Sequence, residues 1–183
     1  MERKQNFIML DQGYIHIYTG EGKGKTSAAL GLAFRALGRG LKVYMAQFLK
    51  GEMSSGEHFS AQAFGDRLTI APFGEPGFIM PGHISPEDRM KATTGLKQAR
   101  EAMESLDYDL VILDEINVAV DLSLLTVQDV LDFLAAKPAR VELVLTGRNA
   151  HPEIMAKADL VSEISPVKHY FQNGIKAREG IEF

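Results

Sequence analysis

Apolar residues along the chain fall into two alternating kinds of run, which predict strands and helices in turn. Short runs that are β-branched or continuously apolar predict strands, and they cover residues 14–18, 42–48, 68–72, 109–115, 141–145 and 159–164. Segments rich in helix formers, or with apolar residues every three or four positions, predict helices, and they cover residues 28–37, 85–106 and 127–134. Shorter helices are expected over residues 57–64 and from His151-Pro152 onward. This alternation predicts an α/β fold with a mostly parallel sheet flanked by helices.

The helix expected from residue 85 has the clearest beginning. Ser85 is a suitable N-cap, Pro86 takes the first helical position, and acids follow in the first turn. One apolar stripe runs along this helix and consists of Ala92, Leu96, Ala99, Met103 and Leu106. The stripe predicts one buried face, and the opposite face, with Lys91, Arg100, Glu101 and Glu104, is expected to be solvated and nothing more.

Composition and charge narrow the class of protein. The chain has 183 residues, 45% of them hydrophobic and 24% charged, so we expect one domain, residues 1–183, with a substantial core. A formal net charge of -4 argues against a broad electrostatic grip on nucleic acid. The absence of cysteine excludes disulfides and thiolate metal sites. No apolar run approaches a transmembrane length, and residues 1–11 lack the apolar core of a signal peptide. We therefore expect a cytosolic protein that binds neither nucleic acid nor a membrane.

The candidate chemistry is concentrated in a glycine-rich segment between the first strand and the first helix. Glycines let the backbone approach an anion, while successive N–H groups and the helix N-terminus point at it. Lys25 is placed to contact phosphates, and the Thr26 hydroxyl is placed to bind Mg²⁺. The candidate nucleotide-binding residues of this segment are Thr19, Gly20, Glu21, Gly22, Lys23, Gly24, Lys25, Thr26 and Ser27.

This segment departs from the usual phosphate-loop spacing. Its first glycine, Gly20, stands one place later than expected, where the usual position holds Thr19, and Lys23 adds a second lysine. A turn that binds nothing is the plain alternative. Three glycines and two lysines within six residues, between a strand and a helix, favour nucleotide binding instead. The expected fold is therefore phosphate-loop NTPase-like (RecA-like).

A second candidate region is the apolar run at residues 109–113, which ends in Asp114 and Glu115. Such a run predicts a buried parallel strand that delivers carboxylates to the carboxyl edge of the sheet. In phosphate-loop proteins an acid at this place helps to hold Mg²⁺. The alternative is that Asp114 caps a helix while Glu115 lies in solvent.

Three further polar residues fall near the carboxyl ends of predicted strands, where open parallel sheets bind ligands. Gln47 and Lys50 follow the second strand, and Arg148 follows the strand at 141–145. We expect them near the nucleotide, although Lys50 equally fits a solvated surface lysine.

Two segments lack a regular pattern. Residues 73–83 contain three glycines and two prolines, typical of a loop, yet include Phe78, Ile79 and Met80. Composition alone favours packing of these apolar residues in the core over a second binding site. Residues 165–183 mix basic, aromatic and glycine positions, and loops of that length are usually functional or disordered.

Taken together, these segments resemble the ATP:corrinoid adenosyltransferases that make coenzyme B12. The resemblance covers residues 13–183 and rests on the loop at residues 18–26 and on residues 47–51, 113–115, 146–148, 166–169 and 174–177, with Gly180-Ile181 following. The late glycine and the extra lysine are features of this family's loop. Asn stands in the family where this chain has Glu21, and Met80 occupies the place of a Trp.

The resemblance implies a homodimeric enzyme that transfers the 5′-deoxyadenosyl group of ATP to cobalt(I) of a corrinoid and releases triphosphate. ATP and Mg²⁺ (or Mn²⁺) would be required, and the corrinoid would be cobalamin, cobinamide or a cobyrinic acid derivative. Lys23 and Lys25 would stabilise the leaving triphosphate, while Thr26 and Glu115, with Asp114, would hold the metal. Phe78 would press on the lower face of the corrin. A reducing flavoprotein such as a flavodoxin would supply electrons.

Two other functions fit part of the sequence. A generic phosphate-loop ATPase or kinase explains the loop and the acids but leaves the Phe78 loop and the C-terminal segment without a role. A non-catalytic module that binds ATP or a corrinoid is the second alternative.

Overall fold

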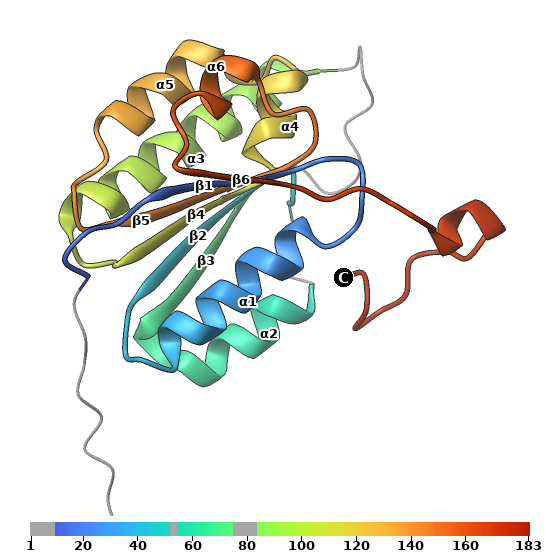
Figure 1. The fold of residues 1–183 in the computed structure, drawn as a ribbon, viewed down its shortest axis with the longest axis horizontal. Helices are drawn as coiled ribbons and strands as arrows, with labels where there is room; N and C mark the ends of the chain where they lie inside the picture. Colours follow the sequence, from blue (N-terminus) through green and yellow to red (C-terminus); the bar gives the residue numbers. More distant parts are fainter. Residues whose placement is uncertain (1–9, 52–54, 75–83) are drawn as a thin grey trace, which may run out of the picture.

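The strands form one parallel sheet in a computed structural model that describes residues 10–51, 55–74 and 84–183. Six strands lie in the order β3-β2-β4-β5-β1-β6 (Figure 1). All neighbouring strands pair in parallel, which confirms the predicted α/β class. The strands are β1 (Ile15–Thr19), β2 (Val43–Phe48), β3 (Leu68–Phe73), β4 (Leu110–Asp114), β5 (Glu142–Thr146) and β6 (Leu160–Glu163).

Helices cover both faces of the sheet (Figure 1). One face packs against α1 (Lys25–Leu37) and α2 (Gly56–Ala61), which a 3-10 helix, η1 (Gln62–Arg67), continues. The other face packs against α3 (Pro86–Ser105), α4 (Ile116–Asp121), α5 (Val127–Ala135) and α6 (Pro152–Met155). Among the described residues, none of these helices combines the length and apolar character needed to cross a bilayer.

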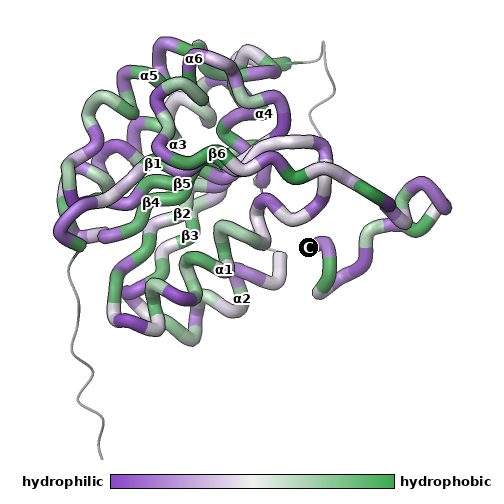
Figure 2. The backbone as a smooth tube through the Cα atoms, in the orientation of Figure 1, coloured by the Kyte–Doolittle hydropathy of each residue, from purple (hydrophilic) through white to green (hydrophobic). Residues whose placement is uncertain are grey.

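The core therefore has two halves, one on each side of the sheet. In β4, Leu110 and Ile112 pack toward α1, while Val111 and Leu113 pack in the other half. All four side chains are buried because successive residues of a strand point to opposite faces and both faces are covered. Figure 2 shows the result as mostly hydrophobic central strands between helices of mixed hydropathy.

Helix α3 begins as the sequence predicts. The Ser85 hydroxyl accepts from the Asp88 N–H at 3.1 Å, and the Asp88 carboxylate accepts from the Ser85 N–H at 2.8 Å, which completes a capping box. The end of the helix was predicted wrongly, because Leu106 lies beyond it at φ 62° and is 40% exposed. A left-handed residue ends the helix and turns its side chain off the buried stripe.

Two other helical predictions need correction. The helix expected over residues 57–64 ends at Ala61 and continues as 3-10 structure, with a kink at Gly65 (φ 57°). Helix α4 was missed, because its six residues continue the apolar run of β4 without a helical period and include two valines and an isoleucine. Such a composition is more typical of a strand.

After β6 the chain leaves the sheet as an extended segment, residues 165–183. It contains a 3-10 turn, η2 (Tyr170–Asn173), and is largely exposed. The segment projects from the sheet, and its end returns toward the N-terminal end of α1 (Figure 1). This return brings the segment to the glycine-rich loop between β1 and α1.

Candidate functional site

A pocket of about 880 Å³ opens beside the glycine-rich loop and extends along α1 as far as Leu37. Of the residues predicted from the sequence, its wall includes Gly22, Lys23, Gly24, Lys25, Thr26, Ser27, Lys50 and Glu115. Residues 180–183 of the C-terminal segment and Glu57 of α2 contribute as well. The predicted residues outside this wall are Thr19, Gly20, Glu21, Gln47, Asp114 and Arg148. Phe78 lies outside the described residues.

Each glycine of the loop is required for its own structural reason. Gly24, which precedes α1, adopts φ 121°, a conformation that side chains rarely allow. Gly22 donates its N–H to the Ile164 carbonyl at 2.7 Å, and a Cβ at Gly22 would lie 2.7 Å from that oxygen. Gly20 packs against the same carbonyl, so the late glycine allows the loop to contact the chain that follows β6.

Lys25 lies inside the curve of the loop. Its ammonium donates to the carbonyls of Gly20 at 2.6 Å and Gly22 at 2.8 Å. Burial lowers the pKa of Lys25, against the opposing influence of the nearby Glu115. The ammonium is thus held at the pocket wall by neutral acceptors, which a phosphate oxygen could replace with a charge-assisted bond.

Asp114 is fully buried at the end of β4, and donors already surround both its oxygens. Oδ1 accepts from the hydroxyls of Thr26 at 2.8 Å and Thr146 at 2.7 Å. Oδ2 lies 3.3 Å from both Gln47 Nε2 and Lys50 Nζ. The alternative of a helix-capping Asp114 is wrong, because α4 has Glu115 at its N-cap and no side-chain cap.

Glu115 differs from its neighbour in having a free carboxylate. The described part of the chain gives this carboxylate neither a hydrogen bond nor an ion pair, while its backbone N–H donates to Thr146 Oγ1 at 2.9 Å. Burial, reinforced by Asp114, raises the pKa of Glu115. Its φ of 62° is uncommon for a residue other than glycine and is a type of strain found at functional sites.

The oxygen donors of this pocket wall are of the kind that binds Mg²⁺. A half-buried carboxylate without a partner, in one pocket wall with a threonine hydroxyl, supplies the hard oxygen ligands that Mg²⁺ prefers. No group of three or more His, Asp or Glu residues forms a metal cage within the described ranges. The residues therefore fit an ion that takes its remaining ligands from phosphate and water.

Glu57 is a second carboxylate partner of Lys50 and Gln47, which both also lie beside Asp114. Glu57 Oε1 accepts from Gln47 Nε2 at 3.0 Å and from Lys50 Nζ at 3.1 Å. Burial opposes the charge on Lys50, but Asp114 and Glu57 outweigh it and raise the pKa of the ammonium. Lys50 is thus a paired lysine at the pocket and not a solvated one. Gln47 Oε1 is buried and lacks a partner in the described part of the chain.

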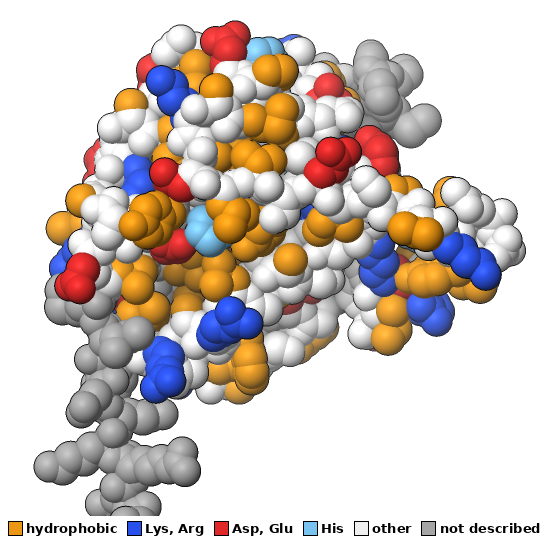
Figure 3. Space-filling model, viewed as in Figure 1, with side chains coloured by type: hydrophobic (Ala, Val, Ile, Leu, Met, Phe, Trp, Pro, Cys, Tyr) orange, Lys and Arg blue, Asp and Glu red, His pale blue; other side chains and the backbone are white. Residues whose placement is uncertain are grey.

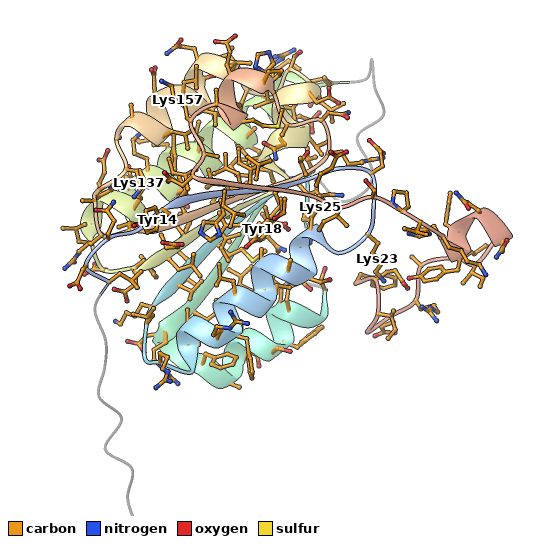
Figure 4. All side chains as sticks on the ribbon, in the orientation of Figure 1. Tyr14, Tyr18, Lys23, Lys25, Lys137 and Lys157 are labelled. Atoms are coloured by element: carbon orange, nitrogen blue, oxygen red, sulfur yellow. The ribbon has the colours of Figure 1, made fainter. Side chains whose placement is uncertain are left out.

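Lys23 and Arg148 point elsewhere than the sequence suggests. Lys23 turns to the C-terminal segment, where its ammonium lies 2.7 Å from Glu182 Oε1 (Figure 4). Arg148 is exposed at the rim, and its guanidinium lies 3.5 Å from Glu21 Oε2. Thr19 is buried in the loop, where its hydroxyl accepts from the Ala150 N–H at 3.3 Å.

Sequence reasoning did not assign a role to several residues of this network. Thr146 contacts both acids. Its position at the end of a buried strand could have identified it, because the same criterion identified Arg148. Glu57 gave no signal beyond its charge. Tyr170 and Glu182 reach the loop only through the path of a 19-residue segment, which no periodicity predicts.

Comparison with known proteins gives a consistent result. The model of the family "ATP:corrinoid adenosyltransferase BtuR/CobO/CobP" matches residues 11–183. A corrinoid adenosyltransferase of Pseudomonas aeruginosa is 40% identical over 94% of this chain and 85% of its own length. One from Escherichia coli K12 is 35% identical over 94% of this chain and 87% of its own.

Solved structures support the fold alone. The flagellar accessory protein FlaH of Methanocaldococcus jannaschii has a TM-score of 0.57 at 17% identity, over 87% of this chain and 74% of its own. A KaiC-like protein of Pyrococcus horikoshii has a TM-score of 0.58 at 14% identity, over 86% and 75%.

Proposed function

The chain belongs to the ATP:corrinoid adenosyltransferase family, and we propose that the pocket beside its glycine-rich loop is where it performs that reaction. The family transfers the adenosyl group of ATP to cob(I)alamin. Membership supports this activity over a generic ATPase or kinase and over a non-catalytic binding module. The observation that carries the assignment of the site is the meeting of Lys25, Thr26 and Glu115 in one pocket wall.

The reaction sets specific demands on this site. Cobalt(I) attacks C5′ of ATP, a cobalt–carbon bond forms with the electron pair of the metal, and the C5′–O5′ bond breaks. Its electron pair leaves with the triphosphate, so negative charge grows on the leaving group. The protein supplies no nucleophile. It must orient the triphosphate, stabilise its charge and keep water from the reactive cobalt.

We assign the stabilisation of charge to the glycine-rich loop. Lys25 is already at the pocket wall, and its bonds to two carbonyls are exchangeable for phosphate oxygens. Lys23 would join it by turning from the C-terminal segment. The Gly22 N–H is taken by Ile164, so the loop N–H groups from Lys23 to Ser27 and the start of α1 complete an anion site. Gln47, Lys50 and Arg148, with Thr19, Gly20 and Glu21, would orient the nucleotide or the loop around it.

We propose that Thr26 and Glu115 hold the Mg²⁺ (or Mn²⁺). When bound, the ion neutralises charge on the triphosphate. Asp114 supports the pair from behind, since its oxygens are engaged by four donors from the protein. Phe78 remains, from the family resemblance, the proposed contact with the lower face of the corrin.

Other features follow from the family and the chemistry. Cobalt(I) must be generated by a one-electron donor, for which a reducing flavoprotein such as a flavodoxin is our proposal. We also propose a homodimer that works in the cytosol.

The test is incubation of the protein with ATP, Mg²⁺ and chemically reduced cobalamin. We expect the visible spectrum to develop the alkylcobalt product, with triphosphate as the phosphate product. Formation of ADP without the alkylcobalt spectrum would contradict the proposal and favour an ATPase or kinase.

A further inference from the structure

The ammonium of Lys23 is fully occupied by the C-terminal segment. It donates to Glu182 Oε1 at 2.7 Å, to the Tyr170 hydroxyl at 2.9 Å and to the Ile181 carbonyl at 3.2 Å. An ammonium group has three N–H donors, so all three are engaged. Lys23 can therefore bind a phosphate oxygen only by giving up at least one of these contacts.

The acceptor carboxylate is itself held in place. Arg178 donates its backbone N–H to Glu182 Oε2 at 2.6 Å, its guanidinium lies 3.3 Å from Oε1, and the Tyr170 hydroxyl also donates to Oε1. Hydrogen bonds from Arg178, Lys23 and Tyr170 hold the pKa of Glu182 far below its usual range. The Ile181 and Glu182 N–H groups both donate to the Arg178 carbonyl, so residues 178–182 form a defined turn. The chain thus presents an ionised carboxylate to Lys23.

This contact lies at the proposed triphosphate site. Gly180, Ile181, Glu182 and Phe183 line the same pocket as Lys25 and Thr26. Figure 4 shows Lys23 directed away from Lys25 and toward the C-terminal segment. In Figure 3, basic side chains gather on this projecting segment, so the Glu182 carboxylate faces Lys23 from a part of the chain that is otherwise rich in positive charge.

We infer that Glu182 is a positioning residue that competes with the substrate's triphosphate for Lys23. The carboxylate and a phosphate are both anionic oxygen ligands for the same ammonium. Binding of triphosphate transfers Lys23 from Glu182 to phosphate and releases the C-terminal segment from the loop. This inference rests on the proposed function for the identity of the anion. In the absence of triphosphate, residues 178–183 therefore bind the Lys23 ammonium in place of a phosphate.

The test measures binding of inorganic tripolyphosphate with Mg²⁺ by calorimetry. Exposed ion pairs are weak, so Glu182→Gln should tighten binding by about two- to fivefold at low salt. The gain should disappear near about 1 M salt, where the pair is screened. Tyr170→Phe, which removes another acceptor of Lys23, should tighten binding in the same direction. The matched control is Glu179→Gln, which changes the same charge on the same exposed turn and should leave affinity unchanged.

A double-mutant cycle separates competition from a general change of field. In a Lys23→Ala background, Glu182→Gln should have no effect on affinity. Equal tightening with and without Lys23, or an unchanged or weaker affinity in the single variant, would overturn the inference. Adenosyl transfer by the wild type is measured separately. If the wild type transfers adenosyl but Glu182→Gln leaves the affinity for tripolyphosphate unchanged, only this inference is overturned. If Glu182→Gln tightens tripolyphosphate binding but the wild type transfers no adenosyl group, only the proposed function is overturned.

Discussion

The two neighbouring acids after β4 differ in what their oxygens already contact. Asp114 accepts from Thr26 and Thr146 and lies beside Gln47 and Lys50, whereas the Glu115 carboxylate has no partner among the described residues. A fully engaged carboxylate is fixed in position, and a free one retains its lone pairs for a cation. The sequence places both acids at the same edge but does not distinguish these roles, because the distinction depends on four donors from three other segments.

Glu115→Gln should lower turnover at least about tenfold at limiting Mg²⁺, with partial rescue by excess metal, because a neutral amide is a weaker ligand. Steady-state rates across a Mg²⁺ titration measure this. Full activity of the variant at limiting Mg²⁺ would refute the role of Glu115 and transfer it to Asp114.

The same variant should be more stable than the wild type at neutral pH. The folded state raises the pKa of Glu115 above its ordinary 4.5, so the ionised form costs folding free energy. That cost is absent below the unfolded pKa and grows as pH rises through the folded pKa. Thermal unfolding without nucleotide should show the two proteins converging toward pH 4 and the variant ahead at pH 7. A variant less stable at pH 7 would show that the carboxylate has a stabilising partner.

Lys25→Ala should remove most ATP binding. A charge-assisted bond contributes about 1.5–3 kcal/mol, which corresponds to roughly a 10- to 150-fold loss of affinity. Calorimetry with Lys42→Ala as the control, an exposed lysine paired with Asp66, measures the difference. Unchanged ATP affinity in a folded Lys25→Ala protein would refute the assignment.

Phe78→Ala separates the two interpretations of that residue. Against the corrin, its loss should slow the reaction from cobalt(II), because the lower axial ligand stays bound, and should affect the reaction from prepared cobalt(I) much less. In the core, its loss should cost roughly 3–5 kcal/mol of stability. Melting temperature and both rates, measured on the one variant, decide; a large drop in melting temperature with equal losses in both rates would favour the core.

At the scale of elements, β5 lies between β1, which leads into the glycine-rich loop, and β4, which ends at the two acids. Thr146 at the end of β5 pairs with Tyr18 of β1 on one side and contacts Asp114 and Glu115 on the other. Its hydroxyl donates to Asp114 and accepts from the Glu115 N–H. The sequence predicts each strand within a residue or two, because continuous apolar runs identify them. It does not predict their order, which is set by contacts between distant segments.

Thr146→Val should keep the shape of this side chain and remove both hydrogen bonds. Leaving a buried N–H and a buried carboxylate oxygen with fewer partners should cost about 1–3 kcal/mol of stability, and the apparent affinity for Mg²⁺ should fall. Denaturant unfolding and a metal titration measure the two effects. Thr94→Val on the exposed face of α3 is the control, and an equal effect of the two substitutions would contradict this role of Thr146.

At the scale of the whole molecule, the predicted parts of the site are those that a short motif encodes. Lys25 and Thr26 are recognisable because loop, strand and helix are adjacent in sequence. Glu57, Tyr170 and Glu182 were not found, because each reaches the site through the path of the chain. Lys23 shows the limit most clearly: its place in the loop was predictable, but the competing carboxylate 159 residues away was not.

The contact between Gly22 and Ile164 has a consequence for synthesis. Strand β1 lies between β5 and β6, so it has no neighbour in the sheet until residues from the last quarter of the chain are available. The loop after β1 then rests on Ile164. A nascent chain would therefore carry an exposed, unpaired β1 and an unsupported loop through most of translation, and competence to bind nucleotide would come only as its final strand emerges from the ribosome.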